Sequence, residues 1–172
     1  SSFGRHIAVT VNEQYGHVVI VWYQSSGTDM YLSTYTVDDN ALTMTVAGED
    51  QELFYANYEW KYINLEWETK YNHVIVVFSN DDYGNGYGIM MQLTFSSNGT
   101  RTYGSSMTEY FENAPSVHMD TCAVNFDNTS TTVTHTSIFA VWHQTSNNYA
   151  RYCWIRPVSG SNEPEYEDKS TM

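Results

Sequence analysis

Three short apolar runs recur along the chain, and they constrain its fold more than any other feature. They are residues 18–21, 74–77 and 138–141. A large aromatic residue follows each run directly, and these aromatic residues are 56 and 64 residues apart along the chain. Continuous apolar runs are typical of strands that are covered on both faces of a sheet. The sequence therefore predicts three copies of one sheet unit.

The segments around each run resemble one another. A short alternating strand is expected before each run and a longer strand after it, with turn residues closing each unit. The strands expected before the runs cover 6–11, 62–67 and 122–126. Those expected after the runs cover 30–37, 87–95 and 149–155. Two further strands fit 42–46 and 102–110. Helical periodicity is nearly absent.

We predict an all-β fold of three antiparallel sheet repeats, each of about 60 residues and arranged like propeller blades. A β-sandwich or a tandem β array is the alternative. The single repeat domain spans 1–162, and the acidic segment 163–172 is expected to be a tail that could also supply a strand to a partner. The repeats are expected at about 5–60, 61–119 and 120–162.

The second repeat carries a family resemblance. Its segment 87–99 follows a Val-Val-Phe strand and an Asp/Asn/Gly turn, and it ends in Phe95-Ser96-Ser97-Asn98-Gly99. This order resembles secreted propeller-type repeats, in which a Val-Val-Trp strand, a Gly/Asp turn and a strand ending in Phe-x-x-x-Gly follow one another. The resemblance implies an extracellular binding or adhesive scaffold, and it carries no catalytic residues across.

The number of repeats has a consequence for assembly. Closed propellers contain about four to eight blades, so three repeats do not close a ring. Two chains could complete a ring of six, or exposed strand edges could pair with a neighbouring chain. We therefore expect the protein to self-associate.

Composition limits the partners and the compartment. The formal net charge is −13, with 7 Lys and Arg against 20 Asp and Glu, which argues against nucleic acid and anionic membranes as partners. Charged residues make up only 16% of the chain, whereas about 25% is usual in soluble proteins. Such a polar but uncharged surface is typical of secreted β proteins, and the start at Ser1 fits a processed end. No apolar run has the 18 or so residues that a spanning helix needs.

Two covalent features would agree with secretion. The two cysteines, Cys122 and Cys153, are expected to form a disulfide, with two buried thiols as the alternative. Two glycosylation sequons begin at Asn98 and Asn128, both in polar segments that resemble turns.

Metal binding has limited support. The loop that contains Asn80, Asp81, Asp82 and Asn85 concentrates oxygen donors beside glycines, which permits a calcium site but equally a solvated hairpin turn. The strict calcium-loop pattern is not met. The six histidines form no close Cys/His cluster, so no zinc site and no obligatory cofactor is expected.

Aromatic residues near turns are the most plausible binding residues. They could stack on a sugar or bury against a protein partner, and the second role is the more common one. They are Tyr15, Tyr23, Tyr83, Tyr87 and Tyr149. Catalytic motifs are missing from the sequence, and the paired carboxylates of Glu66 and Glu68 fit a solvated strand face better than a glycosidase site.

These observations favour an extracellular, non-enzymatic structural or adhesive protein that self-associates into a multimer or a filament. A carbohydrate-binding, lectin-like module is the alternative. A fragment of a propeller hydrolase is a third hypothesis.

Overall fold

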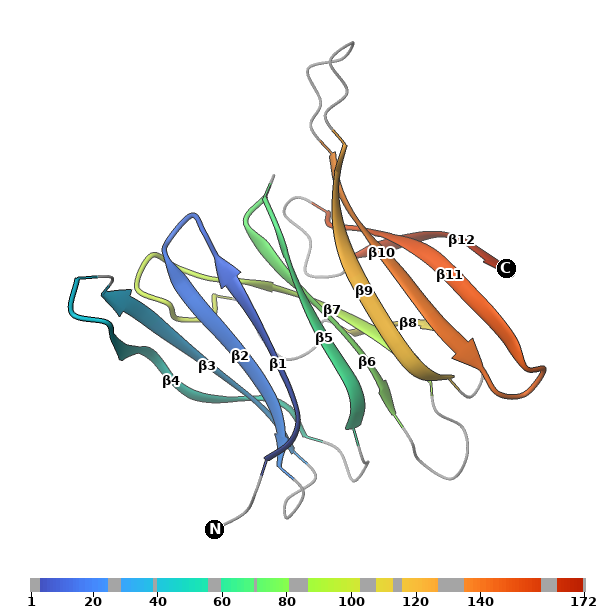
Figure 1. The fold of residues 1–172 in the computed structure, drawn as a ribbon, viewed down its shortest axis with the longest axis horizontal. Helices are drawn as coiled ribbons and strands as arrows, with labels where there is room; N and C mark the ends of the chain where they lie inside the picture. The colour runs from blue at the N-terminus through green and yellow to red at the C-terminus, as the bar shows by residue number, and fades with distance from the viewer. Residues whose placement is uncertain are drawn as a thin grey trace.

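The computed structural model confirms an all-β fold of antiparallel sheets (Figure 1). It describes residues 4–24, 29–38, 40–55, 60–69, 71–80, 87–102, 108–112, 116–126, 135–158 and 164–171. These residues contain twelve strands and no helix. The strands form three four-stranded sheets, each of which follows the chain from one strand to its neighbour.

The first sheet contains β1 (Gly4–Asn12), β2 (His17–Gln24), β3 (Asp29–Asp38) and β4 (Thr43–Tyr55). The second contains β5 (Trp60–Glu68), β6 (His73–Asn80), β7 (Gly88–Thr94) and β8 (Thr108–Glu112). The third contains β9 (Ser116–Phe126), β10 (His135–Gln144), β11 (Tyr149–Arg156) and β12 (Glu165–Thr171).

The three apolar runs occupy the same place in the three sheets. Each lies in the second strand, β2, β6 or β10, which is hydrogen-bonded to a strand on either side. The second strand is therefore paired along both of its backbone edges, and its two faces are what the neighbouring layers cover. The prediction that the runs are equivalent in the three units is confirmed.

The second sheet lies between the other two. On β6, Val74, Val76 and Phe78 pack into the core that the second sheet shares with the first. The alternate residues, Ile75 and Val77, pack into the core shared with the third sheet. Side chains alternate between the faces of a strand, so a strand buried on both faces must be apolar at every position. This two-sided burial explains the continuous run 74–77.

The first strands of the three sheets lie side by side. In Figure 1, β5 runs through the middle of the molecule with β1 on one side and β9 on the other, and both contacts are present in the structure. The later strands spread away from this inner edge. Within the described residues, the three sheets close neither a barrel nor a ring.

Polar contacts hold neighbouring sheets together at their periphery. The Thr34 hydroxyl on β3 donates to the carbonyl of Gly99, 2.7 Å away, in the turn that follows β7. The Gln92 amide on β7 donates to the Val158 carbonyl at 3.0 Å and accepts from the Val158 N–H at 3.1 Å. Each contact joins segments more than 60 residues apart in sequence, and the contacts therefore link neighbouring sheets to one another.

Three expected segments differ from the strands of the structure. The acidic segment 163–172 is not a free tail, because residues 165–171 form β12 and pair with β11 as the fourth strand of the third sheet. The third unit also begins earlier than 120, since β9 starts at Ser116. Of the strand expected at 102–110, residues 108–110 lie in β8, and residues 103–107 lie outside the described residues.

The predicted disulfide was also wrong. Cys122 on β9 pairs with Phe139 in the ladder, whereas Cys153 on β11 pairs with Ala140. Neighbouring residues of β10 point to opposite faces, so the two thiols lie on opposite faces of the third sheet. Cys122 is exposed, Cys153 is buried, and neither takes part in a disulfide.

Gly99 is expected to resist substitution because its backbone and its surroundings both exclude a side chain. Its φ is +82°, and a Cβ there would lie 2.7 Å from the Ala47 Cβ and 2.8 Å from the Thr34 hydroxyl. We predict that Gly99→Ala lowers the free energy of unfolding by roughly 2–4 kcal/mol through backbone strain and overpacking. Urea unfolding followed by circular dichroism measures this loss.

Gly16 provides the matched control. It has a similar φ of +67°, but no atom lies within 4 Å of the Cβ position. Gly16→Ala therefore carries only the backbone strain, about 1 kcal/mol. Equal losses for the two variants would contradict the role of Gly99 as a close contact between two sheets.

Candidate functional site

The outer face of the first sheet is an apolar surface without a neighbouring sheet. Cross-strand partners share a face, and the ladders pair Ile7 with Trp22 and Val9 with Ile20 across β1 and β2. The face continues onto β3 and β4 through Tyr35, which pairs with Val46. We call this surface the leading face. Its apolar and aromatic residues are Ile7, Val9, Val11, Val18, Ile20, Trp22, Tyr31, Tyr35, Val37, Met44 and Val46.

Many of these side chains are exposed to solvent. Ile7 is 61% exposed, Val9 is 55% exposed and Val46 is 62% exposed. Trp22 and Tyr31 stack on one another with ring centroids 5.8 Å apart. Monomeric soluble proteins rarely leave such a large continuous apolar surface in water, so the leading face has the character of a contact surface.

The leading face is equivalent to faces that are buried elsewhere in the molecule. Val18, Ile20 and Trp22 occupy the positions that Val74, Val76 and Phe78 occupy in the second sheet, where they pack against the first sheet. In the third sheet the equivalent residues pack against the second: Ile138, Ala140 and Trp142. The leading face thus has the residues of an inter-sheet contact, and no sheet formed by the described residues covers it.

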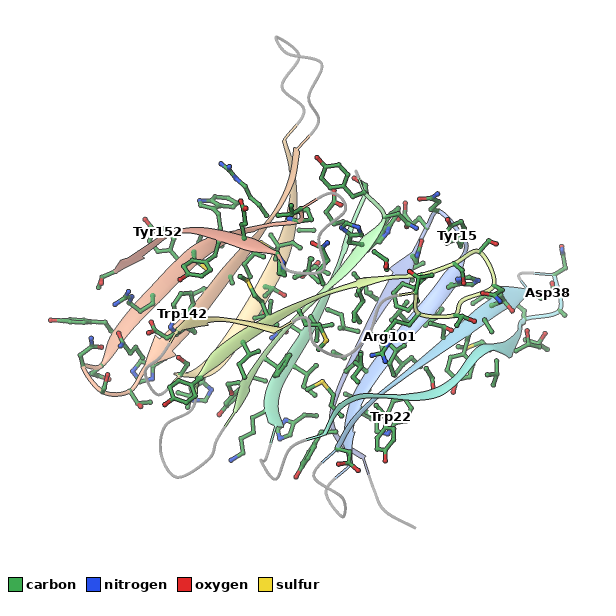
Figure 2. The ribbon with its side chains drawn as sticks, turned by 180° about the vertical axis from the view of Figure 1, so that it is seen from behind. Tyr15, Trp22, Asp38, Arg101, Trp142 and Tyr152 are labelled. Carbon is green, nitrogen blue, oxygen red and sulfur yellow. The ribbon has the colours of Figure 1, made fainter. Side chains whose placement is uncertain are left out.

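The outer face of the third sheet is uncovered at the other end of the stack of sheets. Phe139 and Val141 stand where Ile75 and Val77 stand in the second sheet, and no sheet of the described residues packs against them. The Phe139 ring lies 5.5 Å from that of Tyr152 and 4.9 Å from that of Trp154, measured between ring centroids. We call this surface the trailing face. Figure 2 shows Trp22 of the leading face and Tyr152 of the trailing face at opposite ends of the molecule.

On its β9 part, the trailing face carries different polar residues from those at the equivalent, partly buried positions of β5. In the second sheet, the Asn64 amide donates to the Met119 carbonyl of the third sheet at 3.1 Å. Glu66 accepts from the Thr121 hydroxyl at 3.1 Å, and burial raises the pKa of this carboxyl. At the same register positions of β9, 56 residues later, the trailing face carries Asp120 and Cys122.

The predicted surface aromatic residues are not gathered in one place. Tyr23 is only 4% exposed and lies in the core between the first two sheets, so the expectation of an exposed ring is wrong for it. Tyr87 packs against the same core. Tyr149 is exposed and Tyr15 is half-buried, each in a different turn region. Tyr83 lies outside the described residues.

The other predicted sites are described only in part. Asn98 is exposed in the turn after β7, and its side-chain oxygen accepts from the Thr100 N–H at 3.1 Å. Asn128 lies outside the described residues, as do Asp81, Asp82 and Asn85 of the calcium hypothesis, and of Asn80 only the backbone at the end of β6 is described. In the part of the chain that the structure describes, no three His, Cys, Asp or Glu side chains come close enough to hold a metal ion.

Glu66 and Glu68 do not lie on a solvated face as expected. Glu66 is half-buried against the third sheet, and Glu68 is fully buried. The Glu68 carboxylate accepts from the Tyr71 N–H at 2.8 Å and closes the turn between β5 and β6. Asn12 makes the corresponding contact with the Tyr15 N–H at 3.4 Å in the first sheet. Glu68 therefore has a structural role in a repeated turn.

The sequence did not single out the exposed residues of the leading face. Ile7, Val9 and Val11 alternate with smaller or polar residues as in any strand with one buried face, so their pattern predicts burial. The signal that could have identified them is positional, because among the described residues no sheet packs on the outer face of the first unit.

Comparison with models of known protein families, with curated proteins and with solved structures finds no match for this chain. No helix with the length and apolarity for crossing a membrane occurs among the described residues. The leading and trailing faces are therefore the features from which we infer a function.

The buried histidines make stability depend on pH. His17 and His73 stand at equivalent positions, and their Nδ1 atoms are buried without a hydrogen-bond partner among the described residues. Burial lowers the pKa of His73 to about 4, from a usual value of 6.5. Burial lowers the pKa of His17 as well.

Below pH 6.5 the unfolded chain binds a proton at His73 that the folded protein does not bind until about pH 4. We therefore predict that the free energy of unfolding falls between these pH values, by on the order of 3 kcal/mol from this residue. Above pH 6.5 the residue contributes no pH dependence. Urea unfolding at several pH values should show a shallower fall for His73→Phe, and an unchanged slope would contradict the assignment.

Proposed function

We propose that this protein is a structural β-repeat protein that self-associates, with the trailing face of one copy packing on the leading face of the next. The observation that carries this proposal is the equivalence of the outer faces with the two buried inter-sheet contacts. The leading face repeats the residues with which the second and third sheets meet a preceding sheet. A second copy supplies that missing sheet.

The physical driving force is the burial of apolar surface. Each Å² of apolar area removed from water contributes roughly 25 cal/mol, and the branched and aromatic side chains of the leading face retain much of their area in the single chain. The described residues of the leading face include no charged side chain on β1 or β2. No ion therefore has to lose its hydration there when a partner sheet covers these strands.

The two faces are different surfaces, so their contact is heterologous. Heterologous contacts produce a closed ring when the rotation between copies closes, and an open filament when it does not. In this proposal the sheets act as propeller-like blades, and two chains give six of them, which is within the range of about four to eight in closed propellers. A ring and a filament use the same contact.

The proposed role is structural or adhesive, and the proposed location is extracellular. The support for the location is the small charged fraction of 16% and the polar, uncharged surface. Cys122 and Cys153 form no disulfide, so a disulfide does not support this location. An assembly of stacked sheets would present the turns at both ends of the strands as repeated surface, which suits a scaffold.

A charge on the leading face should prevent association. Val9 lies on the exposed part of β1, and Val9→Lys would place an ammonium group inside the contact. We predict that association weakens about a hundredfold or more, since burying an unpaired charge costs several kcal/mol. Light scattering coupled to size-exclusion chromatography, over a range of protein concentrations, measures the effect.

Leu42→Lys is the control for this experiment. Leu42 is 89% exposed but lies in the turn between β3 and β4, off the strands of the leading face. The two variants gain the same charge, so only Val9→Lys should change the oligomeric state. A wild-type protein that remains monomeric at high concentration would refute the proposed function.

A substitution at Asp120 on the trailing face should strengthen the association of two copies. In the buried contact, the equivalent Asn64 donates to the carbonyl of Met119, and the residue equivalent to Met119 in the first sheet is Ile7. A carboxylate cannot donate to a carbonyl, so Asp120 leaves this hydrogen bond unmade. We predict that Asp120→Asn tightens association about 5- to 10-fold at neutral pH, the contribution of one hydrogen bond.

Asp120→Ala separates the two causes of that gain. It removes the carboxylate but supplies no donor, so its association should lie between the wild type and Asp120→Asn. Analytical ultracentrifugation gives the three dissociation constants. Equal constants for the Ala and Asn variants would show that the hydrogen bond does not form.

A further inference from the structure

A row of three aromatic side chains lies along the inner edge where the first strands meet. His6 on β1, Tyr62 on β5 and His118 on β9 are spaced 56 residues apart along the chain. The ring centroids of His6 and Tyr62 are 6.4 Å apart, and those of Tyr62 and His118 are 5.4 Å apart. The three rings thus connect all three sheets.

Each residue of this row stands at a strained bulge. The ladders are interrupted at the same place in β1, β5 and β9, and the residues there have φ values of 52°, 51° and 51°. Glycine is the residue that adopts this left-handed conformation without strain, whereas other residues pay roughly 1 kcal/mol or more. None of the three positions is glycine. An aromatic ring stands at all three positions although the backbone is strained there, which indicates that the ring contacts have a structural role.

Within the chain, the three rings make contacts between neighbouring sheets. Tyr62 is partly buried, because it has a ring neighbour on both sides and packs against the core between the second and third sheets. His6 and His118 are exposed, since each has a ring neighbour on one side only. The row is therefore unfinished at both ends, and it ends at the same two sheets that carry the leading and trailing faces.

We infer that the row continues across the junction between copies, with His118 of one copy against His6 of the next. This inference rests on the proposed function, because the contact forms only when the trailing face meets the leading face. The spacing expected at the junction is that of the two contacts inside the chain, 5.4–6.4 Å between ring centroids. The junction would then be recognised by two imidazole rings as well as by the apolar faces.

The inference is tested by cross-linking two different cysteine variants. His6→Cys and His118→Cys are each made in a Cys122→Ser background, because Cys122 is exposed while Cys153 is buried. The two variants carry different affinity tags, and they are mixed and treated with a short bifunctional maleimide. We expect a linked pair that contains both tags in the mixture and little linkage in either variant alone, since position 6 meets position 118 and not itself.

The chain with both substitutions distinguishes assembly from linkage within one molecule. Tyr62 separates the two positions inside a chain, so the products should be linked between chains. A linked dimer indicates a two-chain ring and a ladder of sizes indicates a filament, and both support the inference. His6→Phe and His118→Phe serve as non-reactive controls that keep a ring.

The outcomes separate the inference from the proposed function. Association without linkage between positions 6 and 118, or linkage of position 6 to itself, would overturn the row across copies while leaving self-association in place. A wild-type chain that does not associate by light scattering would refute the proposed function instead. Linkage that persists in the Val9→Lys background would also overturn the inference, because it would occur without the junction.

Discussion

The two-sided burial of β6 is the constraint on which the rest of the structure depends. A strand with apolar residues at every position is stable only if a layer covers each face, so the second sheet requires both the first and the third. Those two sheets meet the requirement with one face each. Their remaining faces carry the same kinds of residues because they are copies of the same unit, and this leaves apolar surface at both ends of the stack.

The sequence predicted the parts of the fold that repetition makes visible. The runs 74–77 and 138–141 were placed in equivalent strands because the same residue types recur in the same order. The disulfide between Cys122 and Cys153 was predicted wrongly, since pairing within a sheet depends on which face each residue takes, and that follows from register and not from spacing. The acidic strand β12 was missed because an edge strand with polar side chains lacks the apolar alternation that identifies a strand.

The candidate site could not be recognised from the sequence for a related reason. Val18 and Ile20 are β-branched apolar residues like Val74 and Val76, and no periodicity separates a covered face from an uncovered one. Only the arrangement of the sheets shows that no sheet of the described residues covers the first pair. The row of His6, Tyr62 and His118 was equally hidden, because the positive φ that unites the three positions is a property of the bulges and leaves no residue pattern of its own.

The proposed junction between copies differs from the contacts inside the chain in a way that bears on whether folding or association comes first. Inside the chain, apolar packing is joined by hydrogen bonds from Thr34, Asn64 and Gln92, and the sheets are covalently connected. On the trailing face, Asp120 replaces the donating amide, so the junction has apolar packing but lacks this hydrogen bond. If the proposed junction between copies is weaker than the contacts between sheets, the chain folds first and associates afterwards. Such a hierarchy lets assembly respond to concentration while each copy stays folded.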